Sequence, residues 1–296
     1  MIYELDGVIR PYAWGSRTDI PELLGVEPTD RPAAELWYGA HPDDPARVGE
    51  TTLDQLIAAD PVGMLGERVV AEFGPRLPFL LKVLAAETAL SIQVHPNRAQ
   101  ALAGFAAEDA AGVPRDAPNR NYRDDNHKPE LLCALTEFDA LCGFRPVART
   151  LELFDALDVA ELARYRSALA GPDGLRAAFT ALLTAEDPPV DAVVAALPRL
   201  AGSEWADLGA ALTRVAGDFP GDIGITVALL LNYVRLAPGE AIFLAAGNVH
   251  AYLHGVGVEI LANSDNVLRC GLTGKHIDVP ELLKITDFTP LVEPRW

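Results

Sequence analysis

The apolar residues of this chain change their spacing twice, and this change limits what the chain can fold into. Residues 1–146 contain short apolar runs separated by Pro and Gly, which is typical of the strands of a sandwich or barrel. Between residues 147 and 220 apolar positions recur three and four apart, which predicts four or five amphipathic helices. From about residue 221 the short runs return. We therefore expect a mainly β domain formed by residues 1–146 and 221–296, with a helical insertion at 147–220.

Several individual elements can be predicted within this plan. Short apolar runs between turn residues indicate strands at residues 79–84, 89–95, 130–135, 241–245, 250–253 and 257–261. Helical spacing indicates helices at residues 53–59 and 62–73. The apolar run at residues 223–234 is too long for a typical strand and is interpreted as one buried helix.

The charge of the chain limits its partners. The formal net charge of −18 disfavours binding to nucleic acid and to anionic membrane surfaces. No signal peptide is recognisable, and no apolar run reaches the length of a membrane span. The three cysteines lie in apolar stretches without a CxxC motif, which indicates reduced thiols and a cytoplasmic protein. A site for an anion would need a local cluster of Lys and Arg.

The first chemically informative segment is Ser91-Ile92-Gln93-Val94-His95. Side chains alternate along a strand, so Ser91, Gln93 and His95 share one face. A polar face would be costly inside an apolar core. It fits either a solvated surface or the lining of a polar cavity.

The second segment is Asn126-His127-Lys128-Pro129-Glu130, which directly precedes an apolar strand. The simple interpretation is a solvated loop. The functional interpretation places Glu130 at the start of the strand as a carboxylate ligand of a metal, with Lys128 beside it.

The third segment, residues 238–252, combines a Pro-Gly turn, an apolar strand, a Gly-Asn turn and His250. This order is typical of cupin barrels, in which the His points inward to a metal. His254 competes as the ligand because it has the same strand parity. We favour His250, since His254-Gly255 has the composition of the next turn.

Cations supply the last clue. Arg269 lies in an apolar stretch, where a buried Arg needs either an internal carboxylate or an anionic ligand. Of the 24 Lys and Arg residues, only Lys82, Lys128, Lys275 and Lys284 are lysines, and three of these lie in or beside the segments described. Lysine can transfer protons more readily than arginine.

Gln93, His95, Glu130 and His250 together form a set of two nitrogen and two oxygen ligands for a divalent metal. Zinc accepts such ligands and keeps a position open for substrate in catalytic sites. Ligand type alone leaves Fe²⁺, Mn²⁺ and Co²⁺ possible.

Taken together, these segments resemble those of the type I mannose-6-phosphate isomerases, and the resemblance covers nearly the whole chain. The resemblance rests on the segments SIQVHP, DDNHKPE, GEAIFLAAGNVHAYL and ANSDNVLRCGLTGKHID, with PYAWGS and AELWYGAHP nearer the N-terminus. It implies a cupin-like jelly-roll barrel with an inserted helical domain, and interconversion of mannose 6-phosphate and fructose 6-phosphate.

The resemblance also implies residue roles. One zinc ion per chain would be held by Gln93, His95, Glu130 and His250, and substrate would contact Ser91, Lys82, Lys275 and Tyr252. We expect Arg269 to face the developing enediolate, with Lys275 and Ser91 at the phosphate and Lys128 or Glu259 transferring the proton. A hydride shift is an open alternative.

Members of this family usually continue into a further C-terminal β domain, whereas this sequence stops at Trp296. We expect self-association through the face that such a domain would cover, or low stability. Two other functions remain open: an Fe-dependent cupin oxygenase with His95, His250 and Glu130 as its triad, and a sugar-binding cupin module without turnover.

Overall fold

The computed structural model describes residues 2–296. Its strands are β1 (Val8–Arg10), β2 (Glu35–Gly39), β3 (Arg47–Val48), β4 (Thr51–Thr52), β5 (Phe79–Ala86), β6 (Ile92–Val94), β7 (Glu130–Ala134), β8 (Phe138–Phe144), β9 (Leu231–Leu236), β10 (Ala241–Leu244), β11 (His250–Ala262) and β12 (Leu268–Gly271). All of them except the β3–β4 hairpin belong to one large antiparallel sheet.

The helices before β8 are α1 (Asp19–Leu24), α2 (Leu53–Ala59), α3 (Pro61–Leu65), α4 (Glu67–Phe73) and α5 (Arg98–Ala110). Every element between β8 and β9 is helical: α6 (Val147–Leu157), η1 (Ala160–Leu162), α7 (Ala163–Leu169), α8 (Gly174–Leu183), α9 (Val190–Ala196), η2 (Leu197–Leu200), α10 (Ala206–Asp218) and α11 (Gly224–Ala228). A last helix, α12 (Val279–Ile285), follows β12.

Strand β11 divides the large sheet into two parts, because its two halves have different neighbours. Residues 250–254 pair with β8 and β6, which gives the order β9-β8-β11-β6-β12. This part is called the β9–β12 part after its two edge strands, and it does not include β10. Residues 255–262 pair with β5 and β7, which gives the order β1-β2-β5-β11-β7-β10. A register shift between Tyr252 and His254 lies at the change. Strand β11 therefore belongs to both parts of the sheet and contributes side chains to each.

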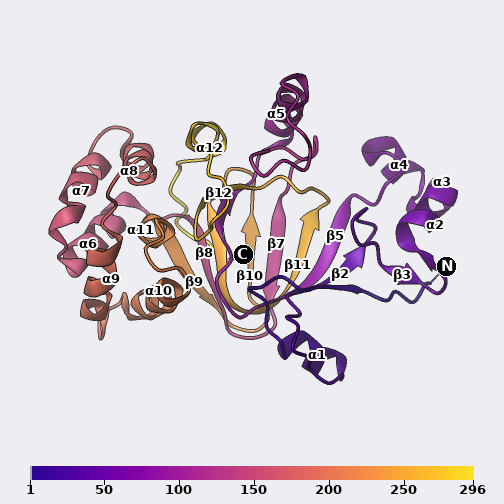
Figure 1. Cartoon of the computed structure of the whole chain (residues 1–296), viewed down its shortest axis with the longest axis horizontal. Helices are drawn as coiled ribbons and strands as arrows, with labels where there is room; N and C mark the ends of the chain where they lie inside the picture. Colours follow the sequence, from indigo (N-terminus) through magenta and orange to yellow (C-terminus); the bar gives the residue numbers. More distant parts are fainter. Residues whose placement is uncertain (1) are drawn as a thin grey trace.

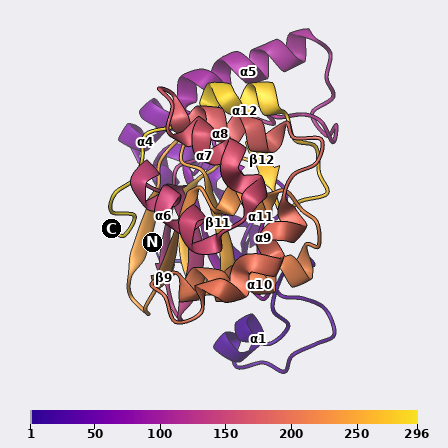
Figure 2. The ribbon, with the colours of Figure 1, turned by 90° about the vertical axis from the view of Figure 1, so that its left-hand side faces the viewer.

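The two largest apolar cores follow from this arrangement. The first contains residues of both parts of the sheet, among them Leu84, Leu132, Phe138 and Tyr252. The second joins Ile92 and Leu141 of the β9–β12 part to the helices α6–α10 through residues such as Leu153, Phe179 and Leu212. The helices thus cover one face of the β9–β12 part, as Figures 1 and 2 show.

Most of the predicted elements are present, and three differ. The helix expected at 62–73 is two helices, because Gly66 adopts a left-handed φ of 83° between α3 and α4. The run at 223–234, predicted as one buried helix, is the short helix α11 followed by strand β9. The two strands expected at 250–253 and 257–261 are the single strand β11, so the turn predicted at His254-Gly255 is wrong. At Gly255 a Cβ would lie 2.5 Å from the carbonyl oxygen of Glu137, so only glycine fits this close crossing.

Candidate active site and metal centre

Strand register gathers the polar segments at one place between the two parts of the sheet. His250 lies opposite Gln93, and Gln93 lies opposite Arg269. In the other part, Lys82 lies opposite Glu259, and Glu130 begins β7. Because residues opposite each other in an antiparallel pair point to the same face, these side chains form neighbouring rows.

Three of the four predicted metal ligands converge on one point. One ligand atom from each of His95, Glu130 and His250 lies within 4.8 Å of the others. The Nε2 atom of His95 is 3.4 Å from one carboxylate oxygen of Glu130, and Nε2 of His250 is 3.3 Å from the other. His95 Nε2 and Glu130 Oε2 are buried and have no hydrogen-bond partner among the described residues. Buried polar atoms left without a partner are costly, and a cation bound between them would satisfy both.

Both histidines are held in the tautomer that metal binding needs. His95 donates from Nδ1 to the carbonyl oxygen of Asn266 at 2.7 Å, and His250 donates from Nδ1 to that of Asn248 at 3.0 Å. A carbonyl oxygen can only accept, so the proton lies on Nδ1 and the Nε2 lone pair points to the cluster. The donor set therefore fits a divalent ion.

Gln93 lies at the edge of this cluster. Its side-chain nitrogen is 3.4 Å from His250 Nε2. The two ends of a Gln amide exchange by a half-turn of the group, which would bring the oxygen to the same position. The structure thus places all four predicted ligands together.

The charge state of the cluster also fits a metal. Burial, reinforced by the positive charge of Lys128, lowers the pKa of His95 to about 4, so its ring is neutral near pH 7. Burial opposes ionisation of Glu130, but the positive charge of Lys128 nevertheless holds the pKa of this carboxyl well below its usual range. Lys128 Nζ is 2.8 Å from Glu130 Oε1. Neutral imidazole and ionised carboxylate are the ligand forms that bind metals.

A second buried network adjoins the cluster. Lys82 Nζ lies 3.5 Å from Glu35 and 3.6 Å from Glu259, and Tyr252 donates its hydroxyl to Glu259 at 2.7 Å. Burial opposes the charge on Lys82, yet its two carboxylate neighbours raise its pKa above the ordinary value. Burial, together with the charge of Glu130, raises the pKa of Glu259. Lys82, Tyr252 and Glu259 thus lie together in one buried network.

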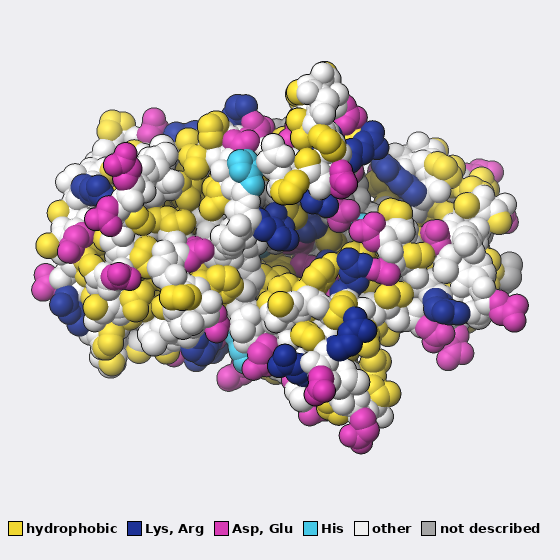
Figure 3. Space-filling model, viewed as in Figure 1, with side chains coloured by type: hydrophobic (Ala, Val, Ile, Leu, Met, Phe, Trp, Pro, Cys, Tyr) yellow, Lys and Arg dark blue, Asp and Glu magenta, His cyan; other side chains and the backbone are white. Residues whose placement is uncertain are grey.

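Arg269, Lys275 and Ser91 lie at the edge of the site. Arg269 is half-buried on β12, next to Gln93 in register, whereas Lys275 is exposed in the loop after β12. Ser91 lies one residue before β6, and its hydroxyl makes no hydrogen bond within residues 2–296. Figure 3 shows Lys and Arg side chains around a hollow in the middle of the molecule, below α5.

Several residues of the site have no signal in sequence spacing. Glu35, which binds Lys82, lies 47 positions before it in the chain. The carbonyl groups of Asn248 and Asn266 orient the histidines through backbone atoms, which residue type does not reveal. The only signal in the sequence is that Glu35, Asn248 and Asn266 fall within the segments that resemble the isomerase family.

A second group of potential metal ligands, His41, Asp43 and Asp265, is not arranged to bind a metal ion. His41 Nδ1 accepts a hydrogen bond from the main-chain NH of Asp43 at 3.2 Å, so a neutral ring carries its proton on Nε2. That Nε2 atom is 3.3 Å from the carboxylate of Asp265. This group is therefore a hydrogen-bonded His–Asp pair, with no lone pair on Nε2 for a metal.

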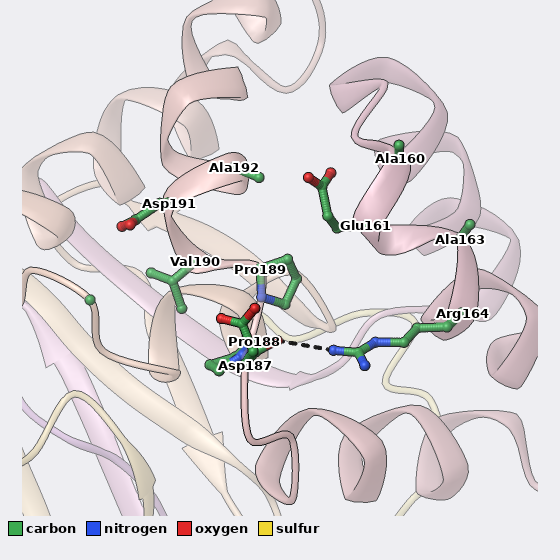
Figure 4. Close-up of a pocket in the computed structure, with 11 residues that line it drawn as sticks. Ala160, Glu161, Ala163, Arg164, Asp187, Pro188, Pro189, Val190, Asp191 and Ala192 are labelled. Atoms are coloured by element: carbon green, nitrogen blue, oxygen red, sulfur yellow. Dashed lines mark hydrogen bonds between the residues drawn. The ribbon is translucent and has the colours of Figure 1, made fainter.

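A cavity of about 790 Å³ lies away from these residues, among the helices between β8 and β9. Glu161, Arg164 and Asp191 line it, and Arg164 donates to the carbonyl oxygen of Asp187 (Figure 4). It contains neither His nor Cys and does not contribute to the metal centre. Across residues 2–296, no helix is long and apolar enough to cross a membrane.

A large antiparallel sheet with a buried His-Glu-His centre and adjacent lysines defines a metal-binding protein with a cupin-like fold.

The model of the phosphomannose isomerase type I catalytic domain matches residues 2–147. The chain is 44% identical to the mannose-6-phosphate isomerase of Salmonella typhimurium over 95% of this chain and 74% of that protein. It is 37% identical to the human protein of the same name, over 98% of this chain and 74% of the relative.

Solved structures agree with these sequence relatives. A crystal structure described as mannose 6-phosphate isomerase bound with zinc and yttrium superposes with a TM-score of 0.89 at 42% identity, covering 99% of this chain and 76% of that one. A second, described as the holo, zinc-bound form, gives a TM-score of 0.89 at 41% identity, covering 98% of this chain and 75% of that one. The chain belongs to the type I phosphomannose isomerase family.

Proposed function

We propose that this protein interconverts mannose 6-phosphate and fructose 6-phosphate. The observation that carries the proposal is the convergence of His95, Glu130 and His250 beside the buried Lys82–Glu259 pair. Two buried ligand atoms of this group have no hydrogen-bond partner within residues 2–296. Membership of the family supports the same activity.

The metal is proposed to be a single Zn²⁺ ion held by Gln93, His95, Glu130 and His250, as the zinc-bound structural relatives support. When bound, zinc supplies Lewis-acid stabilisation of negative charge on oxygen. The remaining chemistry belongs to side chains of this protein.

The isomerisation moves a proton between C2 and C1 of the open-chain sugar through an enediolate. Lys128 and Glu259 are the proposed groups for this transfer, since both are buried beside the metal ligands. Their contacts differ: Lys128 binds Glu130 directly, whereas Glu259 is held by Tyr252 and Lys82. Arg269, next to Gln93 in register, is proposed to stabilise the enediolate oxygen. Lys275 and Ser91 are proposed to bind the phosphate.

The test is a coupled isomerase assay on purified protein, combined with metal analysis before and after chelation. We expect turnover of mannose 6-phosphate that chelation abolishes and that zinc restores. A metal-loaded, folded protein without turnover would contradict the proposed activity. The isomerase relatives do not favour an oxygenase or a non-catalytic sugar-binding module. Measurement of oxygen consumption would detect an oxygenase.

We further propose that residues 1–146 and 221–296 form a jelly-roll barrel and that 147–220 is an inserted helical domain. The helices α6–α10, which together with η1 and η2 lie within residues 147–220, support this division. Limited proteolysis should then cut first near the boundaries of the insertion. A cytoplasmic location is proposed as well, and cell fractionation would test it.

Self-association is the last part of the proposal. Register aligns the outward side chains of Tyr38, Leu81, Ile260, Leu131 and Phe243 in one row across five strands. Ile260 and Phe243 are 40% and 45% exposed, so the row is an apolar surface. Such a surface is a candidate contact between two copies of the chain.

A further inference from the structure

Three cations at the edge of the site have no acidic partner in the part of the chain that the structure describes. Within residues 2–296, the side chains of Arg123, Arg269 and Lys275 form no ion pair and no hydrogen bond. The chain has 42 Asp and Glu residues and a net charge of −18, so acidic partners are abundant. Elsewhere in the molecule, arginines such as Arg120 and Arg235 are paired with carboxylates. The cluster therefore offers its hydrogen-bond donors to a ligand.

Arg123 is presented by a loop that is firmly attached beside β12. Its main-chain NH donates to the side-chain oxygen of Asn266 at 2.7 Å, three residues before Arg269. Asn266 is fully buried, and its side-chain nitrogen donates to the carbonyl oxygens of Asp124 and Asn126, both at 2.8 Å. The carbonyl of the same Asn266 orients the metal ligand His95. The backbone of Arg123 is thus fixed relative to the metal centre.

The three charges are close enough to repel one another. The charge of Arg269, with burial and Arg123 as smaller causes, lowers the pKa of Lys275. Burial lowers the pKa of Arg269, and the charge of Arg123 adds to this effect. Like charges held close together repel one another, and an anion bound among them would reduce that repulsion.

We propose that Arg123 binds the phosphoryl group of the substrate and forms an anion subsite with Lys275, beside Arg269, which lies opposite Gln93 in register. This inference rests on the proposed function, because it assigns one end of a hexose phosphate to the cluster. A phosphoryl group carries the same charge in the substrate and in the transition state. Arg123 therefore contributes uniform binding, which affects KM and leaves kcat unchanged. A guanidinium suits this role because it donates two parallel hydrogen bonds to phosphate oxygens.

The experiment compares Arg123→Gln with the wild type and with Arg68→Gln, which removes the same charge from an exposed position on α4. KM and kcat are measured with mannose 6-phosphate, and inorganic phosphate is used as a competing inhibitor. We expect the KM and the inhibition constant of phosphate to rise about tenfold in Arg123→Gln, the scale of one hydrogen bond to a charged group. The kcat should stay within about twofold, and Arg68→Gln should match the wild type. Arg123→Lys should recover part of the affinity.

Two results would overturn the inference: unchanged KM and phosphate inhibition in an active Arg123→Gln protein, or a fall in kcat at constant KM. Calorimetric binding of inorganic phosphate separates this inference from the proposed function. If the wild type does not isomerise mannose 6-phosphate but binds phosphate in an Arg123-dependent manner, the proposed activity fails and the subsite stands. If Arg123→Gln does not fold, Arg123→Ala takes its place, and unchanged phosphate affinity in folded Arg123→Ala would again contradict the subsite.

Discussion

At the residue scale, backbone carbonyls decide the chemistry of the metal centre. Asn266 and Asn248 each accept the Nδ1 proton of one histidine, which directs both Nε2 lone pairs toward Glu130. An imidazole fixed in this tautomer loses less orientational freedom when it binds a metal. The centre is therefore prepared for a cation by groups outside the ligand set.

The first prediction concerns His250 and its competitor His254. Replacing His250 by Ala should reduce the metal content from about one ion per chain to a small fraction, because a catalytic zinc site depends on each of its few protein ligands. His254 is exposed on the same strand and pairs with Asp139 in register. His254→Ala should therefore keep its metal. Metal analysis of both purified variants is the measurement, and full occupancy in His250→Ala would exclude it as a ligand.

The second prediction separates Arg269 from Lys275. Arg269→Ala should lower kcat by roughly 10²–10³, since it removes a donor from oxygen charge that develops only in the transition state. Lys275→Ala should mainly raise KM, by about tenfold, since the phosphate charge does not change during the reaction. Steady-state kinetics on folded, metal-loaded protein distinguishes the two. An Arg269→Ala variant with altered KM alone would reassign Arg269 to the phosphate.

At the element scale, one buried carboxylate connects the helices to the sheet. Asp139 on β8 accepts hydrogen bonds from Tyr233 and Arg235 on β9, at 2.6 and 3.0 Å, and from Arg214 on α10 at 2.6 Å. Arg235 also pairs with Asp207 of α10 at 3.2 Å. These contacts hold α10 against the β9 edge.

The third prediction follows from this network. Burial opposes ionisation of Asp139, but hydrogen bonds from Tyr233 and the two arginines lower its pKa below the usual value. A lowered native pKa stabilises the fold at pH values above the unfolded pKa, and the stabilisation is lost as the pH falls through the native pKa. Asp139→Asn should therefore reduce the free energy of unfolding by about 2 kcal/mol near pH 7. The difference from wild type should stay constant down to about pH 5 and shrink below about pH 4.

Urea unfolding at several pH values measures this difference. Asp155→Asn is the matched control, because Asp155 and Arg166 form an ion pair between exposed side chains. Exposed pairs of this kind contribute at most about 1 kcal/mol. A pH-independent difference for Asp139→Asn would show that packing, and not charge, sets its effect.

At the scale of the whole molecule, the two outer faces of the sheet differ. Helices α6–α10 pack against the β9–β12 part, whereas the outward row through Leu81, Ile260 and Phe243 is partly exposed. The net charge of −18 disfavours contact between copies at other places. Association is therefore expected to use the apolar row.

The fourth prediction is that Ile260→Glu weakens self-association. Ile260 lies at the centre of the row, and a buried unpaired carboxylate would oppose contact between two copies. Analytical ultracentrifugation of the wild type should show a dimer or larger species, and the variant should shift toward monomer. Thr136→Glu is a control at an exposed position outside the row. A wild type that stays monomeric at high concentration would contradict the proposed contact.

Local sequence determined the spacing-dependent features of this protein. Strand parity placed Gln93 and His95 on one face, three-to-four spacing gave the helices of 147–220, and the segment at Glu130 marked the start of β7. These features depend on neighbours within a few residues, which the sequence shows directly.

Tertiary structure alone decided the rest. Pairing of β11 with both parts of the sheet turned His254 outward and left no turn at Gly255, although the composition favoured one. Glu35 became the partner of Lys82, and the carbonyl of Asn266 became the partner of His95, 171 positions away in the chain. Such contacts depend on which strands become neighbours and on backbone atoms that every residue carries, so residue type and spacing could not specify them.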